Sequence, residues 1–158
     1  MADAVAEALT PITQERVEAQ LTGFGLQHFR NDEGLTVTAF PGMVSFFEFA
    51  DAGCKITTRW LGAVESQDDT RTLHLRANEL NRFIPVLRVH PMTRSDGSTI
   101  ALMEAPLFAT FGVSDSQLTA MLEFYFSTVH QLQAELRKAL PHIPDEMVPE
   151  TGAENTEA

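Results

Sequence analysis

The sequence predicts an α+β protein, in which helices pack on an antiparallel sheet of about five to six strands. Helix-like segments near the start, middle and end of the chain alternate with groups of strand-like segments. The connections between these strands are too short for the helical crossovers that parallel strands need. With 158 residues, 44% hydrophobic and 21% charged, the chain is expected to form one globular domain.

The first helix is expected to begin at Thr10 and Pro11 and to end at Gly23 and Gly25. Threonine is a favourable N-cap, and proline fits the first helical position because it has no N–H to leave unbonded. Residues 1–9 are expected to form a flexible N-terminus, and residues 10–140 the folded domain.

Strand-like segments follow at residues 26–30, 35–40, 43–49 and 54–60, separated by turn-forming clusters such as Pro41-Gly42. The last segment, CKITTRW, alternates strictly. One of its faces carries Cys54, Ile56, Thr58 and Trp60, and the other carries Lys55, Thr57 and Arg59. This alternation is typical of an antiparallel sheet with one side exposed to solvent.

A middle helix is expected from the N-cap Ser66 to Pro85, with Asp69 placing negative charge in its first turn. Its apolar stripe is Leu73, Ala77, Leu80 and Ile84. Two strands then follow at residues 86–90 and 98–104, joined by a turn at Asp96-Gly97.

The last helix has the clearest signals, because Ser114 and Gln117 form a capping box and Pro141 marks its end. Its apolar stripe is Leu118, Leu122, Tyr125, Val129, Leu132 and Leu136. The far end of so long a stripe is expected to extend past the sheet and contact a second copy, giving a homodimer. Residues 141–158, rich in proline and acid, are expected to form a disordered acidic tail.

The element order, the strand ending in Trp60-Leu61, the segment LRANELNRF and the helix after FGVSDSQL resemble those of the YbjN family. These small bacterial proteins are labelled as candidate regulators of sensory transduction and share a fold with type III secretion chaperones. The resemblance spans about residues 10–140 and includes no catalytic motif. It implies a non-enzymatic, dimeric protein of the bacterial cytoplasm that binds another protein.

The net charge of −11 repels phosphate backbones and anionic lipids, so nucleic acid and membrane partners are not expected. The start, MADAVAEALT, lacks the features of a secretory signal, and a cytoplasmic location follows. Cys54 is the single cysteine, which excludes an intramolecular disulfide, and its apolar strand face indicates an inert core thiol. The five histidines show no metal-binding spacing, so no metal or cofactor is expected.

Two groups of residues are candidates for a site. His74, Asn78 and Asn81 lie in a row on the middle helix and form either a ligand-binding strip or polar groups bonded to nearby strand ends. Lys55 and Arg59 on the open strand face either contact a partner or are simply solvated. Trp60 is either a core or an interface anchor.

The sequence therefore predicts a non-enzymatic, chaperone-like regulatory module that binds an unknown protein through Lys55, Arg59, Trp60 and a groove beside the last helix. The alternative is a regulator that senses a small ligand in a pocket at His74, Asn78 and Asn81.

Overall fold

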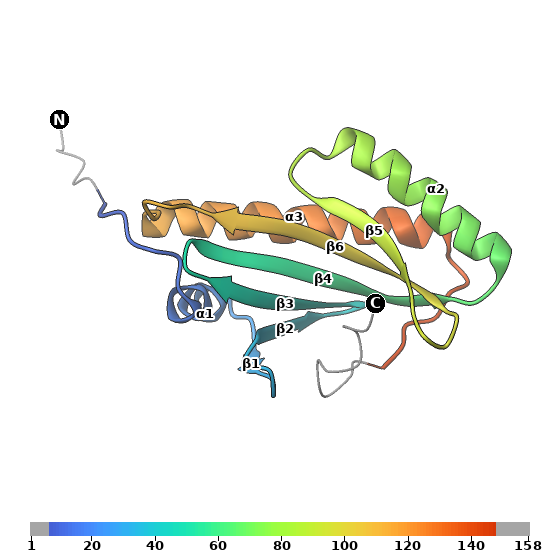
Figure 1. The fold of residues 1–158 in the computed structure, drawn as a ribbon, viewed down its shortest axis with the longest axis horizontal. Coiled ribbons are helices and arrows are strands. Elements are labelled where there is room, and N and C mark those ends of the chain that lie inside the picture. The colour runs from blue at the N-terminus through green and yellow to red at the C-terminus, as the bar shows by residue number, and fades with distance from the viewer. Residues whose placement is uncertain (1–6, 148–158) are drawn as a thin grey trace.

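The computed structural model describes residues 7–147, which form three helices and one sheet of six strands (Figure 1). The elements are α1 (Gln14–Gly23), β1 (His28–Arg30), β2 (Thr36–Phe40), β3 (Met43–Ala50), β4 (Gly53–Val64), α2 (Gln67–Phe83), β5 (Arg88–Thr93), β6 (Thr99–Phe108) and α3 (Asp115–Ala139). Every neighbouring pair in the sheet order β1-β2-β3-β4-β6-β5 is antiparallel. The predicted α+β architecture is confirmed.

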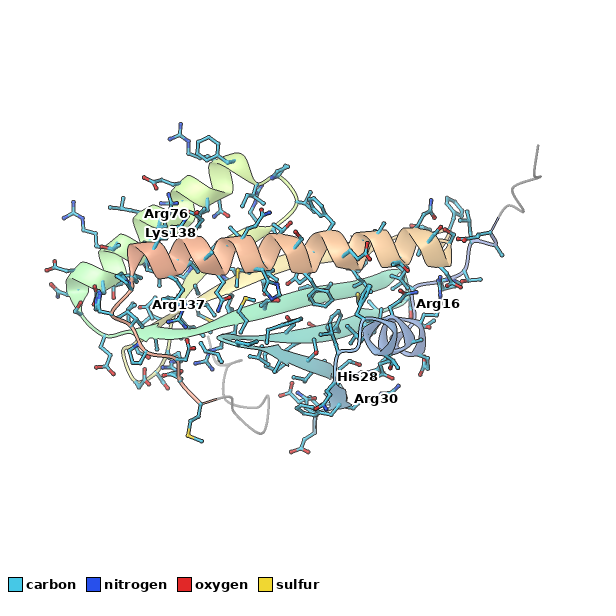
Figure 2. The ribbon with its side chains drawn as sticks, turned by 180° about the vertical axis from the view of Figure 1, so that it is seen from behind. Arg16, His28, Arg30, Arg76, Arg137 and Lys138 are labelled. Carbon is cyan, nitrogen blue, oxygen red and sulfur yellow. The ribbon has the colours of Figure 1, made fainter. Side chains whose placement is uncertain are left out.

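The helices leave one face of the sheet without a helix. Helices α1 and α3 pack on the other face, and α2 lies along the β5 edge with Leu73, Ala77 and Leu80 reaching the same core. Figure 2, which views the molecule from the helical side, shows α3 running lengthwise along the strands. Its 25 residues span about 37 Å at 1.5 Å each, so one helix covers the sheet from end to end.

The two faces of β4 divide as the alternation in CKITTRW predicts. Cys54, Ile56, Thr58 and Trp60 are all buried under the helices. Thr58 is tolerated there because its hydroxyl lies 2.8 Å from the hydroxyl of Tyr125 and 2.7 Å from that of Ser45. Tyr125 also donates to the carbonyl of Met103 at 3.1 Å, so a buried polar chain fastens α3 to three strands.

The first helix begins three residues later than the sequence predicts. Its N-cap is Thr13, whose hydroxyl accepts from the N–H of Arg16. The N–H and C=O of Thr10 are instead bonded to Val113 at 3.1 and 2.9 Å, forming an isolated β-bridge. Both threonines can cap a helix, and the long-range pairing of Thr10 with Val113 decides between them.

The segment after α3 differs from the disordered tail expected for residues 141–158. Asp145 pairs with Gly62 in an antiparallel bridge, and the N–H of Glu146 donates to the carbonyl of Leu61 at 2.7 Å. Residues 141–147 are therefore held against the end of β4. Residues 148–158, like the first six of the N-terminus, lie outside the described residues.

The far end of α3 does not extend beyond the domain. Leu132, Leu136 and Leu140 are at most 1% exposed, because α2 packs beside this end of the helix. Arg76 of α2 pairs there with Glu135, in the region where Figure 2 shows Arg76, Arg137 and Lys138 close together. The apolar excess that suggested a homodimer is thus buried within one chain, and the dimer stays a prediction.

We expect Tyr125→Phe to lower the free energy of unfolding by about 1–2 kcal/mol, since it leaves buried hydroxyls and a carbonyl with one partner fewer. Chemical denaturation measures this change. Phe124→Tyr is the matched control, because Phe124 is 55% exposed on the same helix and a hydroxyl there should change stability by less than about 0.5 kcal/mol. Equal stability of Tyr125→Phe and the unaltered protein would contradict the role given to this hydroxyl.

Candidate functional site: the open face of the sheet

The face of the sheet opposite the helices carries exposed aromatic side chains. Strand register places Phe29, Val37, Phe46, Thr57 and Glu104 in one row across five strands, because directly paired residues share a face. Phe29 is 49% exposed and Phe46 is half-buried. Further along, Phe108 is 56% exposed and lies opposite Gly53, which offers its ring no facing side chain.

A charged strip crosses the same face between these aromatic residues. Lys55, as predicted, is exposed, and its ammonium lies 3.4 Å from Glu48 and 4.0 Å from Glu104. Glu104 also accepts from the Thr57 hydroxyl at 3.0 Å and lies 2.9 Å from the ring of His90. The strip and the aromatic residues together form the open face, which combines apolar area with charges of both signs.

Arg59 belongs to the open face by register but is not solvated there. Its side chain is 4% exposed and it pairs with the carboxylate of Glu146. Arg94, in the β5–β6 turn, donates two hydrogen bonds of 2.7 and 3.0 Å to the same carboxylate. Burial lowers the pKa of Arg59, and the positive charge of Arg94 lowers it further. The pKa of Glu146 lies below its usual range, mainly because its carboxylate accepts hydrogen bonds from Arg94.

Trp60, the third predicted partner-binding residue, lies in the core and is fully buried. The guanidinium of Arg137 lies 5.6 Å from the centre of its ring. The structure therefore places Trp60 as a core anchor, one of the two roles that the sequence allows.

The row His74, Asn78 and Asn81 does not act as a unit. Asn81 donates from its amide to the carbonyl of Val89 at 2.7 Å and accepts from the N–H of Val89 at 2.8 Å. These two bonds fasten α2 to the outer edge of β5, which is the structural role considered for the row. Asn78 and His74 are exposed.

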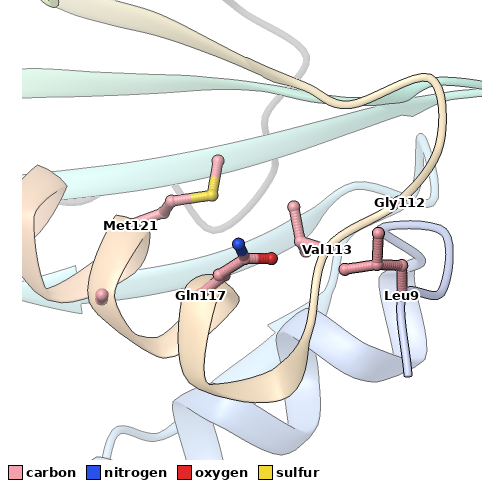
Figure 3. A pocket seen from close by; sticks show the side chains of 6 residues that line it. Leu9, Gly112, Val113, Gln117 and Met121 are labelled. Carbon is pink, nitrogen blue, oxygen red and sulfur yellow. The ribbon is translucent and has the colours of Figure 1, made fainter. Parts of the chain in front are cut away.

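Three shallow cavities are lined by described residues alone, among others on the surface. His74 lines the one near α2, a polar cavity of about 390 Å³ shared with Glu65, Gln67, Thr70, Arg71, Thr93, Gly97 and Thr99. An apolar groove of about 240 Å³ runs beside α3 and is lined by Phe24, Leu26, Phe40, Glu123 and Phe126. The third, between the N-terminal segment and the start of α3, is lined by Leu9, Gly112, Val113, Gln117, Ala120 and Met121 (Figure 3).

Burial raises the pKa of the Cys54 thiol to about 12, so this cysteine stays protonated at neutral pH. Within residues 7–147, no three His, Cys, Asp or Glu side chains are grouped as metal ligands. No helix in this part of the chain is long and apolar enough to cross a membrane.

The fold is that of YbjN. The crystal structure of YbjN from E. coli, described as a candidate transcription regulator, matches this structure with a TM-score of 0.67 and 12% sequence identity. The match covers 87% of this chain and 99% of the YbjN chain. No protein-family model matches the sequence, and no curated protein matches it. The comparison confirms the expected YbjN-like fold.

Several open-face residues are not indicated by the sequence. Phe29 and Phe108 lie in or beside short apolar segments. Only the strand pairing determines which face of the sheet these side chains are on. Arg94 and Glu146 are 52 residues apart, and only tertiary pairing brings them together. An acidic residue in the segment after α3 is the sole sequence signal for this contact, and the composition of that segment predicts a disordered tail instead.

The two asparagines of α2 are expected to respond differently to alanine. Asn81→Ala should lower the free energy of unfolding by about 1–3 kcal/mol, because it leaves the N–H and C=O of Val89 without their partner. Asn78→Ala should change it by less than about 0.5 kcal/mol. Thermal or urea unfolding of both variants tests this, and equal effects would contradict the structural role of Asn81.

Glu146 should stabilise the fold in a pH-dependent way. Its folded-state pKa lies below the ordinary value of 4.5, so its stabilisation is present above that pH and is lost as pH falls through the folded pKa. The stability difference between the unaltered protein and Glu146→Gln should therefore be clear at neutral pH and should decrease steadily as the pH is lowered below 4.5. Asp69, whose pKa is lowered by a hydrogen bond from His142, titrates in both proteins and cancels in the difference. A difference that persists in acid would contradict the charge assignment.

Proposed function

We propose that this protein is a non-enzymatic, chaperone-like regulatory module of the bacterial cytoplasm that binds a segment of another protein on the open face. The observation that carries the proposal is the open face itself, where Phe29, Phe46 and Phe108 are partly exposed around the Lys55 strip. Aromatic side chains with few rotatable bonds are common binding anchors. Helices cover the opposite face, so the part of the open face beyond residues 141–147 is available to a partner.

The charged strip favours a polypeptide ligand over a purely apolar one. Lys55 is bonded to Glu48 and Glu104 at distances of 3.4 and 4.0 Å, with its side chain 47% exposed, so these groups can exchange partners at little cost. Charges of both signs beside aromatic rings match the mixed chemistry of a peptide. The apolar groove lined by Phe24, Phe40 and Phe126 offers a second contact beside α3.

A regulatory role through protein contact agrees with what is said of the structural neighbour. YbjN is described as a candidate transcription regulator. The net charge of −11 disfavours direct contact with DNA, so we propose that any such regulation acts through a protein partner. A homodimer remains part of this proposal, supported by the resemblance and not by the length of α3.

Ligand sensing is a second candidate, favoured by one observation. His74 and Arg71 line the polar cavity of about 390 Å³ beside α2, which has the size of a small-molecule site. Neither Asn78 nor Asn81 is among the residues that line this cavity. A ligand that raises the melting temperature of the unaltered protein but not of His74→Ala would favour sensing.

The open-face proposal is tested by capture of the partner with the full-length protein, expressed at natural levels in its own cells. Lys55→Glu and Phe108→Ser should each reduce the captured polypeptide about tenfold or more, the loss expected for an interface anchor. Mass spectrometry of the eluates measures the amount.

Phe83→Ser is the matched control, because Phe83 is 82% exposed at the end of α2 and lies away from the open face. It should capture as much partner as the unaltered protein. Full capture by both open-face variants, with melting temperatures unchanged, would show that the partner binds elsewhere.

A further inference from the structure

Arg59 and Arg94 form a site on the sheet that is built around a carboxylate. Arg59 lies between the apolar side chains of Val44 and Leu102 in the register of β3, β4 and β6. Its side chain is 4% exposed and that of Arg94 is 18% exposed. An anion bound by both groups offsets the repulsion between two guanidinium groups that have this little contact with solvent.

In this structure the anion is Glu146 of the same chain. Arg94 binds the Glu146 carboxylate in the bidentate geometry typical of arginine, at 2.7 Å from Oε1 and 3.0 Å from Oε2. Arg59 donates to the same Oε2 atom. Asp96 also lies 3.6 Å from Arg94, and its side chain is exposed in the turn. Glu146 is thus the carboxylate that both arginines share.

The backbone around Glu146 behaves like a bound peptide. The N–H of Leu61 donates to Gly42 and its C=O accepts from Glu146. In an antiparallel strand these two groups point to the same side, so residues 145–146 continue the line of β3 past its start at Met43. A short extended segment with a backbone bond and one specific side chain is the pattern by which sheets recognise peptides.

Side-chain pairs, a backbone bridge and one apolar side chain hold this segment. Besides the Glu146 pairs, Asp145 pairs with Arg137, and His142 lies 3.0 Å from Asp69. Ile143 adds an apolar contact with the core. The segment joins α3 through residues 140–144 only, so it can leave the arginine pair while the helices stay in place.

We infer that the arginine pair is a binding site for an acidic, extended segment of the partner protein, and that Glu146 occupies it as a built-in competitor. The inference deepens the proposed function, on which it rests, by naming the chemistry of the partner and a means of regulation. A tethered segment competes at an effective concentration of the order of millimolar, so a free acidic segment binds only when it displaces residues 145–146.

The test measures binding of a free peptide to the full-length protein. The probe is a labelled peptide with the sequence PHIPDEM, residues 141–147, with both ends blocked. Fluorescence polarisation should show binding to Glu146→Gln at least about tenfold tighter than to the unaltered protein, because the variant's own segment competes less well. The peptide with glutamine in place of glutamate should bind neither protein measurably.

Three outcomes overturn the inference. These are equal binding of the peptide to both proteins, equal binding of the glutamate and glutamine peptides, and unchanged binding when Arg94→Ala is added to Glu146→Gln in a protein that keeps its circular dichroism spectrum. The comparison of the two peptides on one variant needs no further substitution, so it decides even if Arg94→Ala fails to fold.

A last measurement separates this inference from the proposed function. Glu146→Gln should capture severalfold more of the polypeptide that the unaltered protein captures. Unchanged capture would refute an acidic partner segment at the arginine pair while leaving binding at Lys55 and Phe108 intact. Conversely, if Lys55→Glu and Phe108→Ser do not reduce capture, partner binding on the open face is refuted, and the peptide experiment still tests the arginine pair.

Discussion

The structure depends on the burial of one long helix along one side of a sheet. Helix α3 presents apolar side chains from Leu118 to Leu136, and all of them need cover. The sheet supplies it for most of the length, α1 flanks the first turns, and α2 closes the far end. Because this requirement places every helix on the same side or at the β5 edge, it also leaves the opposite face without a helix.

Much of the fold could be predicted because its signals are local. The alternation of CKITTRW, the turn at Pro41-Gly42 and the capping box of Ser114 with Gln117 each depend on residues within a few positions of one another. Gly42 shows why such turn signals are reliable, since its φ of 79° is a conformation that other residues rarely adopt. The strands and helices therefore appeared where the sequence placed them, within a few residues.

The candidate site was harder to predict because it is assembled by distant pairings. The sequence correctly places Lys55 on the exposed side of its strand. It cannot show that Arg59, four residues on and on the same side, is covered by residues 87 positions later in the chain. The N-cap predicted at Thr10 is wrong for a related reason, since the backbone of Thr10 is bonded to Val113, 103 residues away. Alternation tells which side a residue faces but not what lies over it.

The side-chain amide of Asn81 has a consequence for how the molecule behaves at high concentration. A sheet whose outermost strand has free N–H and C=O groups can grow by adding strands from neighbouring molecules, the first step toward fibrils. At β5 the side-chain amide of Asn81 forms hydrogen bonds with both the N–H and the C=O of Val89. One residue of an added strand would form the same two bonds. At the opposite edge of the sheet, β1 has only three residues, so it offers few backbone groups for an added strand to pair with. The protein can therefore keep one broad face available to a partner while its sheet resists polymerisation.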